Sequence, residues 1–574
     1  MPSAPAAAPA ERAPAAPAAV PARRRAPADW PAFVGLAVVL VGGLALRLVN
    51  IGHGLPFTYH ADETFHFTKR AIAMLAHGDL DPRYFQNPSG FTELVYVAER
   101  LRFLAFRPFG SGTEVLARWR TDPTAIWITA RCVAVLLCML GVVAVFAVGR
   151  RLWGAGVGLV AAAALSFAFL PVAYSRYALT DVGVFAPVAV AVLAIVLVAE
   201  DGRRRWFVIA GAAIGLACGF KYTAGALVVP LAVAAGLRAR AGGRAALVSA
   251  ALAVAVAVAA FLVTTPYFVV DLHRALYQIK VQARNADIPK VGQAPEGQVG
   301  FYLRSLTWGL GWGAAVAAAL GAVLEARRRP LRAALLVLFP VVLFVYLCTG
   351  ERYFARWLLP TYPVLALLAG VAVARVAAAV AERPAARAGV LVALTAGMLV
   401  QPFVQNVHVA KVLGRADTRQ LARDHLVRTL PAGGRFVVEP DVPGRWVPPE
   451  LDAVFGPPPK SRTLRWGSVT RFILDLSPTR IERYRRAGAC TVVTMSPVSD
   501  RARSTGRRAV LAYYRALRRE GRVVFRASPY RPGAKPVPFD FDFSTHLYLP
   551  RAYARPGPAV TVYRLRDCRE ATRE

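Results

Sequence analysis

Residues 126–149 read IWITARCVAVLLCMLGVVAVFAVG, and two arginines, Arg150 and Arg151, follow this apolar run directly. About 20 apolar residues in a helix are enough to cross the hydrocarbon core of a bilayer. Comparable runs alternate with short charged breaks from residue 33 to about residue 405. Each backbone polar group inside a bilayer must be satisfied within its own segment, so such runs form helices. The sequence therefore predicts a polytopic α-helical membrane protein.

Eleven such runs are present, and we expect each to form one transmembrane helix. One assignment has an alternative. Residues 206–237 form either two short helices around Lys221 or a single helix, and a single helix would break the alternation of charged breaks downstream. We therefore prefer two helices. The expected spans are 33–49, 126–149, 153–173, 180–199, 206–220, 222–237, 245–266, 304–324, 331–348, 357–377 and 387–405.

Arginine-rich breaks occur at every second junction between these spans, and the positive-inside rule places them, with the N-terminus, in the cytoplasm. These breaks hold Arg23–Arg25, Arg150–Arg151, Arg203–Arg205, Arg238, Arg240 and Arg244, Arg327–Arg329, and Arg383 and Arg387. An odd number of helices leaves the C-terminal part outside. We predict a multi-pass protein of the plasma or inner membrane. Its outward junctions are 50–125, 174–180, Lys221, 267–303 and 349–356.

The chain divides into three parts. Residues 1–30 are rich in Ala and Pro and predict a disordered cytoplasmic tail. Residues 31–405 form the transmembrane domain with its first outer loop at 50–125, and the first run lacks a cleavage site and is expected to stay as an anchor. Residues 406–574 predict a small extracytoplasmic α/β domain. Its expected strands are Arg435–Glu439, Thr491–Thr494, Arg522–Phe525 and Ala559–Tyr563, and its expected helices are Thr418–Leu430, Pro478–Ala487 and Arg507–Glu520.

The composition fits this class of protein. Of 574 residues 56% are hydrophobic and 18% charged, and the mean hydropathy is +0.42, which excludes a disordered or fibrous protein. The net charge of +36 would indicate a nucleic-acid binder only on a polar domain. Residues 406–574 hold 29 arginines and 3 lysines against 15 acidic residues. We interpret the charge as topology determinants plus an outer surface facing anionic lipid or glycan, and expect no nucleic-acid partner.

The six cysteines show no metal-binding spacing. Cys132, Cys138, Cys218 and Cys348 lie in apolar runs and are expected to be core residues. Cys490 and Cys568 lie in the polar C-terminal region. They either pair, if that region faces an oxidising compartment, or remain two separate thiols.

The first outer loop contains the most informative segment, YHADETFHFTKRAIAMLAHGDLDPRYFQNPSG from Tyr59 to Gly90. Asp62 and Glu63 lie about a dozen residues after the first helix, near the membrane surface. A carboxylate there can act as a general base that removes a proton from an attacking hydroxyl or amine. The alternative is a solvated acidic turn that caps a helix.

A third acid and several cations are expected on the same outer face. Asp181 opens the fourth helix, where its ordinary role would be a favourable charge at a helix N-terminus. Cations at the outer boundary suit the phosphate of a lipid-linked donor. The alternative is that they reach toward lipid head groups. These cations are Arg176, Lys221, Arg352 and Arg356.

Metal binding is a weaker hypothesis. His60 and His66 flank the acidic pair, but HADETFH is not the HExxH motif of zinc proteases. A divalent metal held by Asp62, Glu63 and a distant histidine is one alternative, and the sequence requires no cofactor. The chain also lacks GxxxxGK[ST], a GxGxxG that opens a helix after a strand, and GxSxG, so ATP and serine hydrolysis have no support.

The order of the motifs HADET, RYALTD, KYT and ERYFARWLLPTYP resembles the GT-C glycosyltransferases of the protein O-mannosyltransferase and aminoarabinose-transferase type. The similarity covers about residues 33–410, and RPGPAVTVYRL resembles an ending common in bacterial members. The resemblance implies a polyprenyl-phosphate sugar as donor, a lipid, glycan or protein as acceptor, and inverting transfer at the outer face.

The same resemblance assigns roles to residues. Asp62 would be the catalytic base with Glu63 beside it, Asp181 would line the same cavity, and the cations would lie near the lipid phosphate. Aminoarabinose-transferase relatives have Glu-Lys-Pro-Pro where this chain has residues 86–89, Gln-Asn-Pro-Ser. That departure weakens His273 as a metal ligand. A lipid transporter or flippase is the competing class, but it predicts charges at mid-membrane and repeat symmetry, which the sequence does not show.

Overall fold

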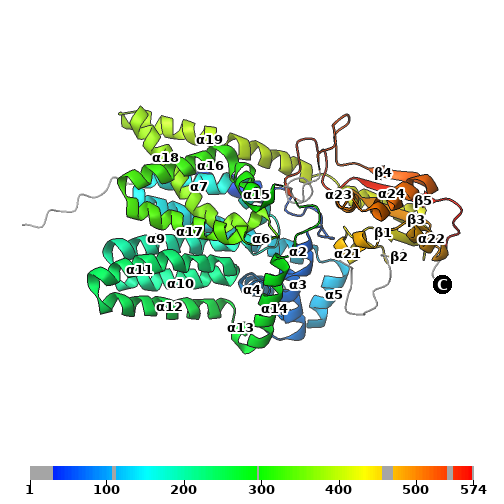
Figure 1. The fold of residues 1–574 in the computed structure, drawn as a ribbon, viewed down its shortest axis with the longest axis horizontal. Helices are drawn as coiled ribbons and strands as arrows, with labels where there is room; N and C mark the ends of the chain where they lie inside the picture. Colours follow the sequence, from blue (N-terminus) through cyan, green and yellow to red (C-terminus); the bar gives the residue numbers. More distant parts are fainter. Residues whose placement is uncertain (1–29, 107–111, 294–295, 455–468, 539–546, 572–574) are drawn as a thin grey trace, which may run out of the picture.

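The computed structural model describes residues 30–106, 112–293, 296–454, 469–538 and 547–571, so almost all of the predicted tail lies outside the described residues. It consists of a long helical bundle and a C-terminal α/β domain packed at one end of it (Figure 1). The chain thus has the predicted fold class, a polytopic helical membrane protein with a small C-terminal α/β domain.

Every predicted span coincides with helix. In the described residues nine helices are long and apolar enough to cross a membrane, or ten if the bent pair α7–α8 is one span. The remaining one, α10, has 17 residues, which is the lower limit for a span, so the total of eleven stays a prediction. The segments are α1 (Trp30–Leu48), α6 (Thr124–Trp153), α7 (Ala155–Phe167), α8 (Phe169–Ser175), η1 (Asp181–Val184), α9 (Phe185–Asp201), α10 (Arg204–Phe220), η2 (Tyr222–Leu227), α11 (Val228–Gly242), α12 (Arg244–Thr264), α15 (Gly297–Leu306), η3 (Thr307–Gly311), α16 (Trp312–Arg328), α17 (Pro330–Cys348), η4 (Ala355–Thr361), α18 (Tyr362–Val380) and α19 (Pro384–Leu413).

Helix α10 packs on α12 through a row of glycines. A Cβ added at Gly211 or at Gly215 would lie 2.1 Å from the carbonyl oxygen of Ala253 or Ala257, respectively. Small residues four apart allow helix backbones to approach closely, which is how helices associate in lipid. This stripe holds α10 in the bundle, and the extended backbone at Lys221 separates it from η2 and α11, so residues 206–237 form two helices.

The two ends of the bundle are distinct. Several short helices lie at the end nearest the C-terminal domain (Figure 1). The arginine-rich junctions meet elsewhere: Arg332 forms an ion pair with Glu200 and Arg238 donates to the Val198 carbonyl. These contacts bring the junctions near residues 200, 238 and 332 together, and the alternation of all junctions between two ends stays a prediction. The short helices are α2 (Ala61–Phe65), α3 (Phe67–His77), α4 (Gly90–Phe106), α5 (Gly112–Thr121), α13 (Tyr267–Val270) and α14 (Leu272–Ala286).

The C-terminal domain has a five-stranded sheet in the order β2-β1-β3-β5-β4, in which β1 is parallel to β2 and β3 and the other pairs are antiparallel. All four predicted strands and all three predicted helices are present. The sequence missed β2, α21 and α23, and α19 continues to Leu413, beyond the boundary expected at residue 405. The elements are β1 (Arg435–Val438), β2 (Asp452–Val454), β3 (Thr491–Met495), β4 (Gly521–Ala527), β5 (Val560–Leu565), α20 (Thr418–Thr429), η5 (Gly444–Trp446), α21 (Val469–Leu474), α22 (Thr479–Arg486), α23 (Ser496–Ser504) and α24 (Arg508–Glu520).

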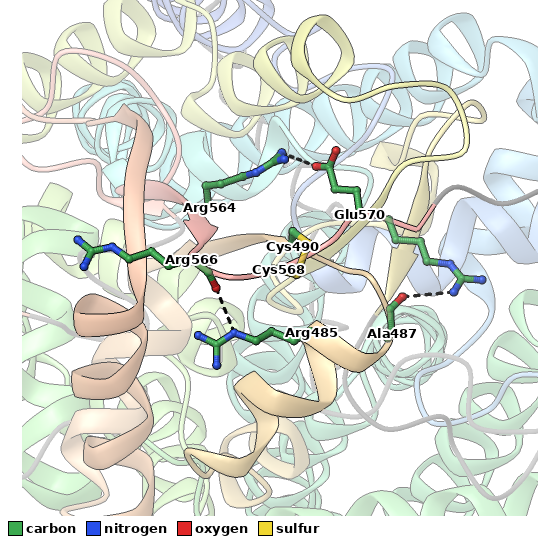
Figure 2. Close-up of a disulfide and its surroundings, with 8 residues drawn as sticks. Arg485, Ala487, Cys490, Arg564, Arg566, Cys568 and Glu570 are labelled. Carbon is green, nitrogen blue, oxygen red and sulfur yellow. Dashed lines mark hydrogen bonds and ion pairs between the residues drawn. A yellow bond between two sulfur atoms is a disulfide. The ribbon is translucent and has the colours of Figure 1, made fainter.

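A disulfide joins Cys490, just before β3, to Cys568, just after β5, so the first of the two alternatives for these cysteines is the correct one. Figure 2 shows the bridge beside the hydrogen bond from Arg485 to the Arg566 carbonyl and the ion pair of Arg564 with Glu570. The bridge ties the chain end to the central strand of the sheet.

Arginines of the C-terminal domain hold it against the first outer loop. The Arg419 guanidinium lies 3.7 Å from the centre of the Tyr59 ring, and Arg423 lies 5.2 Å from that of Phe57. Such contacts combine ring burial with cation–π attraction. The C-terminal domain is therefore fixed at the same end of the bundle as the first outer loop.

Candidate active site

Asp62 lies in α2, and its carboxylate forms an ion pair with Arg356 and lies 3.7 Å from His66 Nε2. Its side chain is 30% exposed, so it remains accessible from outside the protein. Burial has the largest single effect and raises the pKa of Asp62, but the charge and hydrogen bond of Arg356, together with the charges of His60 and His66, hold the pKa below its usual value. Asp62 is therefore ionised and able to accept a proton.

Glu63, the next residue, points the other way. Arg131 in α6 donates to both of its carboxylate oxygens, at 2.7 and 2.9 Å, and the Ala178 N–H donates to Oε1 at 2.9 Å. Both side chains are almost fully buried, at 0% and 1% exposure. Glu63 thus joins the first loop to α6 and to the turn after α8, and it does not face the same opening as Asp62.

Two cations, Lys221 and Arg356, connect Asp181 to Asp62. Lys221 Nζ is 2.5 Å from Asp181 and donates to the Arg356 carbonyl at 3.0 Å, while the side chain of Arg356 contacts Asp62. One connected cluster therefore contains two acids and two bases from four chain segments. All four of these residues were predicted to lie on the same face, because each lies in or next to an outward junction.

A further group of cations lies close to this cluster. Burial lowers the pKa of Lys290, in the loop between α14 and α15, to about 8, and the charges of Arg352 and Arg501 add to that effect. Arg352 Nε donates to the Ile288 carbonyl at 3.1 Å, in the same loop. Arg501 belongs to α23, so the C-terminal domain contributes positive charge to this end of the bundle.

Other predicted residues lie elsewhere. Arg176 is buried and donates to the Leu46 carbonyl, so it supports the helix packing behind the site. His273 is exposed on α14. Among the residues that the structure describes, no group of three or more His, Cys, Asp or Glu side chains could hold a metal ion. The residues present do not fit a metal centre, and the chemistry below uses none.

Sequence reasoning missed Arg131 and Lys290. Arg131 lies within the apolar run of α6, and the mean hydropathy of that run stays high despite this single charge. A charged residue in such a run is costly and is usually paired, and that rule would have indicated a partner in an outer loop. Lys290 lies in a polar loop with no pattern to distinguish it.

The bundle with short helices at one end is similar in fold to solved GT-C membrane proteins of the ArnT type. The family model described as dolichyl-phosphate-mannose-protein mannosyltransferase matches residues 127–269. This region runs from α6 to α13 and includes Asp181 and Lys221. No curated protein sequence matches the chain significantly.

Two solved structures share this fold over most of their length. ArnT from Cupriavidus metallidurans bound to undecaprenyl phosphate has a TM-score of 0.54 and 16% identity, and the match covers 93% of this chain and 98% of that one. The archaeal oligosaccharyltransferase AglB from Archaeoglobus fulgidus, in complex with an inhibitory peptide and a dolichol-phosphate, has a TM-score of 0.50 and 12% identity, and the match covers 87% and 73%. These likenesses establish a multi-pass membrane fold.

Proposed function

We propose that this protein is an inverting glycosyltransferase that moves a sugar from a polyprenyl-phosphate donor to an acceptor at the outer face of the cell membrane. The observation that carries the proposal is the ionised, partly exposed Asp62, held by Arg356 in a cluster with Asp181 and Lys221. The fold supports it, because both structural neighbours were solved with a polyprenyl phosphate or dolichol-phosphate.

Asp62 acts as the general base in this reaction. Its carboxylate takes the proton of the acceptor hydroxyl or amine while the acceptor atom attacks the anomeric carbon of the sugar. The bond from that carbon to the phosphate oxygen breaks, and its electron pair leaves with the polyprenyl phosphate. Attack opposite the leaving group inverts the configuration at the anomeric carbon.

Cations near Asp62 stabilise the leaving phosphate. Preorganised positive groups are most effective where charge develops in the transition state. Lys290 is close enough to Arg352, Arg356 and Arg501 for their charges to lower its pKa further, and Arg501 belongs to the C-terminal domain. Lys221 is already paired with Asp181 and holds the Arg356 backbone, so it positions the cluster.

The Cys490–Cys568 disulfide supports the outer location, because disulfides persist in oxidising compartments. The C-terminal domain and Asp62 share one end of the bundle, and the arginine-rich junctions gather away from it. The proposed orientation therefore has the N-terminus in the cytoplasm and the C-terminal domain outside.

The test is to supply purified protein with a panel of polyprenyl-phosphate sugars and acceptors and to measure consumption of each donor. One donor should be consumed by the wild-type protein. The Asp62→Asn variant should lose about 10²–10⁴-fold in rate, the usual contribution of a general base. It should still fold, with at most a small loss of thermal stability, because the amide keeps the volume of the carboxyl group and only a partly exposed ion pair with Arg356 is lost.

Full activity of Asp62→Asn would refute its role as the base. Movement of the labelled donor across a vesicle membrane without any release of sugar would instead favour the transporter class. His77→Gln is a matched control, because His77 is an exposed residue on α3 that bonds only to the Ala73 carbonyl one turn earlier.

A further inference from the structure

His66 lies beside the carboxylate of Asp62, and the two carboxylate oxygens have different neighbours. Arg356 contacts Oδ2, whereas His66 Nε2 lies 3.7 Å from Oδ1. This separation is too wide for a hydrogen bond. Within the described ranges of the chain, no hydrogen bond reaches Oδ1. Oδ1 is therefore the oxygen that is available to take a proton from a substrate.

Both side chains can be reached from outside the protein. The side chain of His66 is 26% exposed and that of Asp62 is 30% exposed. One atom can lie about 2.7–3.0 Å from both Oδ1 and Nε2, because these two atoms are only 3.7 Å apart. A single polar atom of a substrate can therefore form hydrogen bonds to both side chains at once.

Aromatic stacking fixes the ring of His66. The ring centre lies 4.8 Å from that of Tyr84, with an angle of 16° between the two planes. Tyr84 is buried, and Asn87 donates to its hydroxyl at 2.7 Å. Stacked rings resist rotation because they lose contact area when they turn. Nε2 of His66 therefore keeps its position beside Asp62.

The protonation of His66 decides which atom it can bind. Burial lowers the pKa of this ring below its usual value, nearby arginines add to the effect, and the charge of Asp62 opposes it. The ring is therefore uncharged at neutral pH and gains a positive charge only in more acidic solution. A neutral imidazole has one N–H, and a carboxylate can only accept. The proton therefore belongs on Nε2, which faces Oδ1, and Nε2 is a hydrogen-bond donor.

A hydroxyl group can bind to both partners and still react, because it has one proton and two lone pairs. The proton points to Oδ1 of Asp62, one lone pair accepts the Nε2–H of His66, and the other lone pair attacks the sugar. An amine nitrogen has a single lone pair, which the attack itself needs. The lone pair of an amide nitrogen is delocalised into its carbonyl group. Neither nitrogen can accept from Nε2 during the attack.

We propose that His66 and Asp62 together bind the attacking atom of the acceptor, and that this atom is a hydroxyl oxygen. The inference rests on the proposed function and names its acceptor class. Asp62 takes the hydroxyl proton while the oxygen forms its bond to the anomeric carbon. The bond from that carbon to the donor phosphate breaks, and its electron pair leaves with the phosphate. His66 keeps its proton throughout and stabilises the negative charge that develops on the attacking oxygen.

One test needs no substrate, because water offers the same proton and lone pairs as a hydroxyl group. A high-resolution experimental structure of the full chain should show an ordered water within hydrogen-bond distance of Asp62 Oδ1 and His66 Nε2. A gap without such a water, or a direct hydrogen bond between the two side chains, would overturn the proposal whether or not the protein transfers sugar.

A second test identifies the atom that receives the sugar. The donor that the wild-type protein consumes is supplied with hexanol, hexylamine and hexanamide, which share one chain and differ in the attacking group. Mass spectrometry and NMR of the product show the linkage. Transfer to the oxygen of hexanol is the expected result. Transfer to the nitrogen of hexylamine or of hexanamide would overturn the proposal.

Two variants separate the hydrogen bond of His66 from its stacking. His66→Phe keeps a ring on Tyr84 but has no N–H, and kcat/KM for the acceptor should fall about 10–100-fold, because a hydrogen bond to an atom that gains charge is lost. The donor KM should change by less than about twofold. His66→Gln keeps an N–H that reaches about as far as Nε2 and should recover most of the lost rate. A purely structural role of His66 would not produce this difference between the two variants.

The outcomes separate the two hypotheses. A wild-type protein that consumes no donor refutes the proposed function, whereas the bridging water still decides whether Asp62 and His66 form a hydroxyl-binding pair. Full activity of His66→Phe, or an equal loss in His66→Phe and His66→Gln, refutes the role of His66 and leaves Asp62 as the base. His77→Phe is the matched control and should keep the wild-type rate, because His77 is exposed on α3 and bonds only to the Ala73 carbonyl.

Discussion

Two charged networks hold the ends of the bundle, and they differ in what their acids can reach. At the end away from the C-terminal domain, Glu325 of α16 is fully buried, accepts from Trp153 Nε1 at 3.1 Å and pairs with Arg332 and Arg375. At the other end Asp62 pairs with Arg356 but stays 30% exposed. Both networks join several helices, so the presence of buried charge does not identify a site. Asp62 differs from Glu325 in being partly exposed while it also belongs to a cluster with Asp181 and Lys221.

The same difference separates two neighbouring residues. Glu63 is saturated by Arg131 and the Ala178 N–H, whereas Asp62 faces outward. Under the proposed function, Glu63 has a positioning role and Asp62 is the base. We therefore expect that substitution of a buried, fully paired acid lowers stability, whereas substitution of the partly exposed Asp62 lowers the transfer rate.

The largest effect on stability is expected for Glu63→Ala. Removing one partner of a buried ion pair leaves the other charge unpaired, which typically costs about 3–5 kcal/mol. Thermal and denaturant unfolding of the purified protein should show this loss, while the loss in Asp62→Asn should be much smaller, because its ion pair with Arg356 is partly exposed. The companion variant Glu63→Leu with Arg131→Met removes both charges and should recover part of the stability. An unfolding midpoint for Glu63→Ala equal to that of the wild type would break the comparison.

Some of this contrast could be predicted from the sequence. The alternation of apolar runs and arginine-rich breaks places Asp62, Asp181, Lys221 and Arg356 at one end, because each lies at an outward junction. It does not show which cation pairs with which acid. Adjacent acids look equivalent in the sequence, and only the turn of α2 sends Glu63 inward and Asp62 outward.

Other features of the site and the fold could not be predicted from the sequence, because they depend on contacts between distant segments. Arg131 lies inside an apolar run, so its pairing with a loop residue becomes visible only once the loop is folded onto α6. Strand β2 has three residues and no alternation to mark it, and β1 alone supports it in the sheet. The position of Lys290 depends on where the loop after α14 comes to lie.

Removal of the disulfide should have the next largest effect. The double variant Cys490→Ala, Cys568→Ala should lower the stability of the C-terminal domain by about 2–4 kcal/mol. Differential scanning calorimetry of the full chain measures this loss. In wild-type protein from intact cells, Cys490 and Cys568 should resist alkylation until a reductant opens their disulfide. Ready alkylation without reductant would place the domain, and Asp62 with it, on the reducing side of the membrane.

Glu325→Gln should cost less, about 1–3 kcal/mol, because the amide can keep the bond from Trp153 but no longer balances Arg332 and Arg375. Its effect should be confined to stability. The transfer rate per folded molecule should equal that of the wild type. A rate loss comparable to that of Asp62→Asn would mean that the two networks are coupled through the bundle, contrary to the division drawn here.

The smallest effect is a change in pH dependence. Burial raises the pKa of Asp62, but Arg356, with smaller contributions from His60 and His66, holds it below its usual value, so the wild-type carboxylate is ionised throughout the range from about pH 5 to pH 8. In Arg356→Gln the effect of burial remains without the compensating charge, and the pKa of Asp62 rises. A larger fraction of Asp62 is then protonated as the pH falls, and a protonated acid cannot act as a base. The ratio of the rates at about pH 5 and about pH 7.5 should therefore fall by up to about tenfold relative to the wild type, since one pKa unit is a factor of ten. The ratio within each variant cancels any loss of phosphate binding that is equal at the two pH values.

Arg352→Gln is the matched control, because Arg352 bonds to the Ile288 carbonyl and does not contact Asp62. An unchanged ratio in Arg356→Gln would show that a group other than Asp62 takes the proton, and the exposed acid would then be a structural residue like Glu325.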